Sequence, residues 1–150
     1  ETIDIHDIIE DAINHVSLLI DDRKGSLETH FEAIISEISG NEFHLTNVIV
    51  NILENAIKYS EGSPKIEVYT ESTNKYFIIK VKDDGIGREA SQKNKKVQHN
   101  SKAIKITKER LSLIETQENT KCSLQFIDLM EDKKPTGTQV IITIPLIKIW

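Results

Sequence analysis

Three polar residues in the middle of the chain have the spacing of neighbours on one face of a helix. Asn51, Asn55 and Lys58 follow one another at steps of four and three residues, which places them along one stripe. Asparagine is a mediocre helix former because its amide competes for backbone hydrogen bonds. Two amides in register with an ammonium therefore indicate a helix wall that offers oxygen atoms to a cation and positive charge to an anion. A magnesium-phosphate ligand needs both kinds of partner.

The helix that must carry this stripe is predicted from apolar residues that recur at helical spacing. They are Leu45, Val48, Ile49, Ile52, Leu53, Ala56 and Ile57. We predict a helix over about His44–Ser60, which the turn Gly62-Ser63-Pro64 ends. The apolar residues form the buried face of this helix, and the polar stripe lies on another face.

Two further motifs lie at the ends of predicted strands. The segment Tyr76–Lys82 alternates between apolar and polar residues and runs into Asp83-Asp84-Gly85-Ile86-Gly87. A strand that stops at a carboxylate and two glycines predicts a tight turn where the backbone approaches a ligand closely. Farther along, Gly137-Thr138 reads as a turn that opens a long apolar strand, Gln139–Ile147.

Together, these motifs resemble the N box, the G1 box and the final Gly-Thr strand of the GHKL superfamily. More narrowly, the chain resembles the catalytic and ATP-binding domain of bacterial sensor histidine kinases, from about Ile3 to Leu146. Each motif is common alone, but their order and spacing within one short domain are specific. The resemblance implies a protein histidine kinase of a two-component system that binds ATP and Mg²⁺. It would transfer the γ-phosphate to a histidine on a separate dimerisation domain and signal to a response regulator.

The resemblance also implies a role for each candidate residue. Asn55 would be the magnesium ligand, while Asn51 and Lys58 would lie at the phosphates and serve catalysis. Asp83 would accept a hydrogen bond from the adenine amino group, a donor that guanine lacks at that position. The other residues implied to contact the nucleotide are Tyr59, Gly85, Gly87 and Thr138. From the residues alone, an exposed surface asparagine at position 55 and a turn-forming aspartate at position 83 stay open as alternatives.

A general base for water activation is missing from the expected place. In the ATP-hydrolysing relatives the base lies one helical turn before the magnesium asparagine, where this chain has Asn51, which cannot take a proton. Glu54 is out of position for that task. None of the five histidines lies in the setting of a phosphoacceptor helix, so we expect the isolated domain to bind nucleotide and turn over little.

Composition favours one globular domain over residues 1–150, and the histidine settings together with the resemblance imply that this domain does not include the dimerisation and phosphoacceptor domain. The chain is 38% hydrophobic and 29% charged, and no apolar run approaches the roughly 20 residues of a membrane span. Its single cysteine, Cys122, fits a reducing compartment, so we expect a cytoplasmic location. The net charge is −5, although the segment Arg88–Arg110 holds eight basic and two acidic residues. The acidic remainder argues against nucleic-acid binding.

The remaining elements predict an α+β fold, a two-layer sandwich whose mixed, mostly antiparallel sheet carries three helices on one face. This is the Bergerat-type fold that the resemblance implies. Asp4 is expected to cap the first helix, which Arg23-Lys24-Gly25 ends. The other expected strands are Leu27–Phe31, Ile34–Ile38, a stretch that includes Ile66, Val68 and Thr70, and Ser123–Met130. A third helix is expected at Ile104–Glu118.

A loop as long as the one predicted at about Arg88–Ser101 is usually a functional lid or disordered, and both alternatives stay open from the residues alone. The resemblance implies that it is a lid over the nucleotide. No glycine occurs between Gly87 and Gly137, and Ala103 stands where a short-lid group of kinases, which the second half of the chain resembles, has glycine. The chain therefore reads as a composite of two kinase types. Two alternatives stay open: a degenerate nucleotide-binding or docking module with weak catalysis, and a stand-alone GHKL ATPase or serine kinase.

Overall fold

The computed structural model describes residues 2–58, 60, 62–84, 108–109, 122–131 and 134–146. The long helices of this part of the chain are α1 (Ile5–Asp22) and α2 (Glu42–Lys58). The strands are β1 (Thr2–Asp4), β2 (Ser26–Phe31), β3 (Glu37–Ser39), β4 (Lys65–Ser72), β5 (Tyr76–Asp83), β6 (Ser123–Glu131) and β7 (Lys134–Pro145). Lys108 and Glu109 are helical, within the expected third helix, and the rest of that helix lies outside the described residues.

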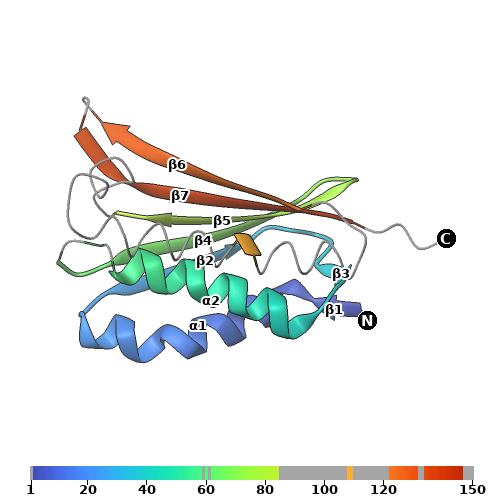
Figure 1. The fold of residues 1–150 in the computed structure, drawn as a ribbon, viewed down its shortest axis with the longest axis horizontal. Coiled ribbons are helices and arrows are strands. Elements are labelled where there is room, and N and C mark those ends of the chain that lie inside the picture. The colour runs from blue at the N-terminus through green and yellow to red at the C-terminus, as the bar shows by residue number, and fades with distance from the viewer. Residues whose placement is uncertain are drawn as a thin grey trace.

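Five strands form one twisted sheet in the order β2-β4-β5-β7-β6. β2 runs parallel to β4, and the other three neighbouring pairs are antiparallel. The path from β2 to its parallel neighbour passes through α2, and both helices lie side by side against one face of the sheet (Figure 1). This arrangement confirms the predicted α+β sandwich with a mixed, mostly antiparallel sheet.

The core lies between the helix layer and the inward-facing side chains of the sheet. Its helical part consists of buried side chains at the predicted spacing, including all seven apolar residues expected on α2. The sheet contributes alternate residues of its central strands, as a pleated strand with one covered face requires. These are Ile66, Val68, Phe77, Ile79, Val81, Val140, Ile142 and Ile144.

The start of α1 is tied to the sheet by a capping aspartate and a histidine. The Asp4 carboxylate accepts a hydrogen bond from the backbone N–H of His6 at 2.9 Å, which confirms the expected N-cap. The His6 ring stacks on Phe31 with ring centroids 4.4 Å apart, and its Nε2 lies 2.9 Å from Oγ1 of the buried Thr70. His6 therefore helps to hold the start of α1 against the sheet.

The predicted strand at Ile34–Ile38 is wrong in its bounds. Only Glu37–Ser39 is a strand, and it pairs with β1, which the sequence did not indicate. Ile34 is 94% exposed, and its backbone N–H donates to the side-chain Oγ of Ser72 at 3.0 Å rather than to a backbone carbonyl of a strand. Apolar alternation misled here because a three-residue strand depends on its distant partner and not on its own pattern.

Candidate functional site

The polar stripe on α2 lies where the spacing predicted, beside the buried face of the helix. Asn51 and Asn55 are half-buried, and Lys58, the last residue of the helix, is exposed. Their apolar neighbours in the sequence, Ile52 and Ala56, are buried in the core. The two amides thus stand at the border between core and solvent, where a bound ligand can reach them.

Asp83 and Thr138 form the second part of the site, on neighbouring strands. They are register partners in the antiparallel pair of β5 and β7, and both are half-buried. The backbone N–H of Thr138 donates to Oδ1 of Asp83 at 3.3 Å. Asp83 falls on the same side of β5 as the buried residues Val81 and Ile79, so its carboxylate faces the helix layer.

Gly137 allows β7 to approach the end of β5 closely. It lies inside β7, which begins at Lys134, so the expected turn at Gly137-Thr138 is wrong. Its φ is +146°, and a Cβ atom added there would stand 1.8 Å from the carbonyl oxygen of Asp83. On the other side, Oδ1 of Asp84 accepts a hydrogen bond from the N–H of Lys65 at 3.1 Å. The end of β5 is therefore held by both of its neighbouring strands.

The stripe and the strand ends belong to elements that pack together. α2 contacts β5, and the C-terminal ends of the two elements lie on the same side of the molecule (Figure 1). The structure thus places Asn55 and Lys58, near the end of α2, on the same side as the β5 end that carries Asp83. Three other expected contacts lie outside the described residues: Tyr59, Gly85 and Gly87. The expected lid and Ala103 also lie there.

Arg23 is a residue of this region that sequence reasoning read only as a helix stop. It follows α1 directly, and its guanidinium donates hydrogen bonds to the carbonyl oxygens of Ile57, Ser60 and Gly62. These oxygens lie at the end of α2 and in the turn that follows. No local pattern predicts a contact between residues 34 or more positions apart, so the sequence held no signal for it.

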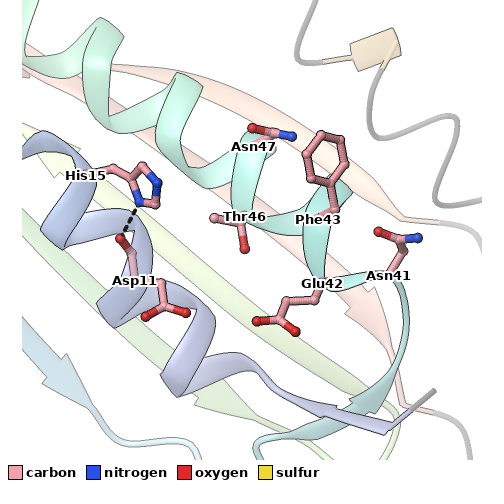
Figure 2. A pocket seen from close by; sticks show the side chains of 7 residues that line it. All are labelled: Asp11, His15, Asn41, Glu42, Phe43, Thr46 and Asn47. Atoms are coloured by element: carbon pink, nitrogen blue, oxygen red, sulfur yellow. Dashed lines mark hydrogen bonds between the residues drawn. The ribbon is translucent and has the colours of Figure 1, made fainter.

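A separate groove lies between α1 and the N-terminal part of α2 (Figure 2). Its volume is about 560 Å³, and its lining consists of Asp11, His15, Asn41, Glu42, Phe43, Thr46 and Asn47. Nδ1 of His15 donates to the backbone carbonyl of Asp11 at 2.8 Å, and the ring of Phe43 is 71% exposed. None of the predicted nucleotide contacts lines this groove, so it is a different surface from the candidate site.

The oxygen-bearing side chains of the candidate site suit a hard cation that takes most of its ligands from water and phosphate. In the part of the chain that the structure describes, no three side chains of histidine, cysteine, aspartate or glutamate gather as a metal cluster. Asn55 offers a single amide oxygen, which fits Mg²⁺ that brings water and phosphate oxygens with it. None of the helices among the described residues combines the length and apolarity needed to cross a membrane.

A comparison with known protein families matches residues 40–148 to the family described as histidine kinase-, DNA gyrase B-, and HSP90-like ATPase. The matched range includes α2, β5 and β7, and therefore every described residue of the candidate site. Similar proteins are the sensor protein RprX of Bacteroides fragilis, 30% identical over 87 residues, and the sensor protein kinase WalK of Staphylococcus saprophyticus, 33% identical over 89 residues. The alignments cover 57% and 58% of this chain, but only 17% and 14% of these relatives.

Solved structures share the fold at low sequence identity. The catalytic domain of the histidine kinase ThkA has a TM-score of 0.75 at 14% identity, and the match covers 97% of this chain and 96% of that domain. The mycobacterial sensor histidine kinase MprB has a TM-score of 0.75 at 17% identity, with 97% of each chain covered. A complex of ThkA with the response regulator TrrA matches with a TM-score of 0.73 at 15% identity, covering 98% of this chain and 42% of the kinase chain.

Proposed function

Because this chain belongs to the family of histidine kinase-, DNA gyrase B- and HSP90-like ATPases, we propose that it is the ATP-binding catalytic domain of a two-component sensor histidine kinase. It binds Mg-ATP and transfers the γ-phosphate to a histidine of a separate dimerisation domain. The observation that supports this most is the placement of the Asn51–Lys58 stripe and the Asp83–Thr138 pair on packed elements within the matched range.

In this proposal, residues at the end of β5 and in the neighbouring part of β7 bind the adenine base. Asp83 accepts a hydrogen bond from the adenine amino group, and a carboxylate can do so while it also accepts the Thr138 N–H, since it has about four lone-pair sites. Thr138 contacts the adenine side of the pocket. Gly85 and Gly87 let the backbone approach the base, and the close packing of β7 on β5 keeps the carboxylate in place.

The polar stripe on α2 binds Mg²⁺ and the phosphates in this proposal. Asn55 holds Mg²⁺ through its amide oxygen, and Asn51 contacts the phosphate region one turn earlier. The ammonium of Lys58 offsets phosphate charge, while Tyr59 packs near the adenine. When bound, Mg²⁺ neutralises charge on the phosphate oxygens. The half-buried position of the two amides supports these roles, because it places their side chains beside the core and within reach of a ligand.

The phosphate acceptor is a histidine outside this chain in the proposal. Among the described histidines, His6 is engaged with Thr70 and His15 with the carbonyl of Asp11, while His30 stacks on Tyr69. Asn51 occupies the position of the hydrolytic base and cannot accept a proton, which favours transfer to histidine over attack by water. The domain spans residues 1–150 and acts in the cytoplasm with its dimerisation domain and a response regulator, the kind of partner that ThkA has.

A second candidate is a degenerate nucleotide-binding or docking module. Ala103 in place of glycine and the lack of glycines between Gly87 and Gly137 favour it. Magnesium-dependent ATP affinity separates the two candidates, because a docking module has no need of it. A stand-alone ATPase is disfavoured by Asn51.

The proposed function is tested by phosphotransfer. The chain is mixed with a purified dimerisation domain of a sensor histidine kinase and with ATP labelled on the γ-phosphate. We expect label on the acceptor histidine, dependent on Mg²⁺ and lost in the Asn55→Ala variant. Absence of transfer, together with nucleotide binding that does not depend on Mg²⁺, would favour the degenerate module instead.

A further inference from the structure

The guanidinium of Arg23 holds the end of α2. Its Nη1 donates to the carbonyl oxygen of Ile57, and its Nη2 donates to the carbonyl oxygens of Ser60 at 2.7 Å and Gly62 at 2.8 Å. The hydroxyl of Ser60 adds a bond to the carbonyl of Ala56 at 2.6 Å. Carbonyls at the end of a helix have no partner within the helix. Here the Arg23 side chain, from outside α2, binds one such carbonyl, that of Ile57, and two carbonyls in the turn that follows the helix.

Arginine suits this position for two physical reasons. A cation at a helix C-terminus is stabilised by the negative end of the helix dipole. The planar guanidinium also presents several donors in a fixed fork, so that one side chain can bind three carbonyls at once. A lysine keeps the charge, but its donors radiate from a single nitrogen atom and its side chain lacks the fork.

The point from which Arg23 reaches is itself fixed against the same turn. The N–H of Ser26 donates to the carbonyl of Pro64 at 2.8 Å, and a Cβ atom added to Gly25 would stand 2.6 Å from that proline. The backbone after α1 therefore packs tightly against the segment that follows α2. Arg23 therefore reaches the end of α2 from a segment that is itself packed and hydrogen-bonded against the turn after α2.

We propose that Arg23 is a positioning residue for magnesium-nucleotide binding. It fixes the last turn of α2 and with it the side chains of Lys58 and Asn55, which bind phosphate and Mg²⁺ in the proposed function on which this inference rests. Arg23 touches the carbonyls at the helix end and acts on the ligand only through α2. The adenine contacts of Asp83 and Thr138 lie on other elements, whereas Tyr59 follows α2 directly, so Arg23 supports the adenine contacts less than the contacts to phosphate and Mg²⁺.

The test compares Arg23→Ala and Arg23→Lys with the unaltered chain, at a temperature well below the unfolding midpoint of each variant. Calorimetry measures the dissociation constant of Mg-ATP, and amide shifts in nuclear magnetic resonance spectra measure that of adenosine, which lacks phosphates. If loss of the cap leaves the last turn formed about a tenth of the time, Arg23→Ala weakens Mg-ATP about tenfold. The Mg-ATP affinity of Arg23→Lys should fall between those of Arg23→Ala and the unaltered chain, and adenosine affinity should fall less than Mg-ATP affinity in both variants.

Ile9→Val serves as the matched control, because Ile9 is fully buried in the first half of α1, at the opposite end of that helix from Arg23. It lowers global stability by removing one buried methyl group and should leave both affinities unchanged. Unchanged Mg-ATP affinity in the two Arg23 variants would overturn the inference while leaving the proposed function intact. Equal weakening of adenosine would also overturn it. An unaltered chain that fails to bind Mg-ATP would overturn the proposed function and this inference together.

Discussion

The carboxylate of Asp83 accepts the backbone N–H of its cross-strand partner Thr138 at 3.3 Å. Gly137, the residue before Thr138, makes this possible because β7 passes so close to β5 that a side chain has no room. The Asp83 carboxylate is thereby oriented by a backbone group of the neighbouring strand. A group held in this way can discriminate a donor on a ligand without first being ordered by it.

The Asp83→Asn variant should bind ADP more weakly by about 1.5–3 kcal/mol, the usual worth of a charge-assisted hydrogen bond. The amide oxygen of asparagine can still accept the Thr138 N–H, so the fold should persist. Calorimetry with ADP measures the loss. Asp84→Asn is the matched control, since Asp84 is exposed and its carboxylate accepts the N–H of Lys65. Equal ADP affinity in Asp83→Asn and the unaltered chain would remove Asp83 from the base contact.

The Asn55→Ala variant should remove the magnesium dependence of ATP binding and leave the fold nearly intact. Asn55 is half-buried and lies outside the apolar face of α2, and alanine is the best helix former. ATP affinities with and without Mg²⁺ supply the measurement. If magnesium still tightens ATP binding by the factor seen in the unaltered chain, Asn55 is not the ligand.

The Gly137→Ala variant should lose both stability and nucleotide affinity. Its φ of +146° costs about 1–3 kcal/mol for a residue with a side chain, and the new Cβ collides with the backbone of Asp83. Denaturant unfolding measures the stability. Gly62→Ala is the matched control, because Gly62 also has a positive φ, +71°, but no atom within 4 Å of an added Cβ. A smaller loss of unfolding free energy in Gly137→Ala than in Gly62→Ala would contradict the inference that β7 passes too close to β5 for a side chain.

The Ala103→Gly variant should improve the affinity for ATP more than that for ADP. The prediction rests on the sequence alone, in which alanine replaces the glycine of the short-lid kinases. A glycine permits closer approach of the backbone to a ligand, and the γ-phosphate is expected nearest to this position. Both affinities are measured in both variants. An equal gain for the two nucleotides, or none for ATP, would show that Ala103 does not limit the site.

The sequence predicted most accurately those parts whose structure follows from local patterns. The apolar repeat of α2 is buried as expected, Asp4 caps α1, and Tyr76–Lys82 lies within β5. The pairing of β1 with β3 and the reach of Arg23 to the end of α2 were not predictable, because both join distant segments. Gly137 looked like a turn residue because glycine is common in turns, while its actual role depends on the neighbouring strand.

The proposal that nucleotide binds at the ends of α2, β5 and β7 is tested most directly by nuclear magnetic resonance mapping of bound Mg-ADP. We predict that amide shifts gather at Asn51, Asn55, Asp83 and Thr138, with little change in the groove between α1 and α2. Shifts centred on the groove residues His15, Phe43 and Asn47, with none at the strand ends, would contradict the proposal.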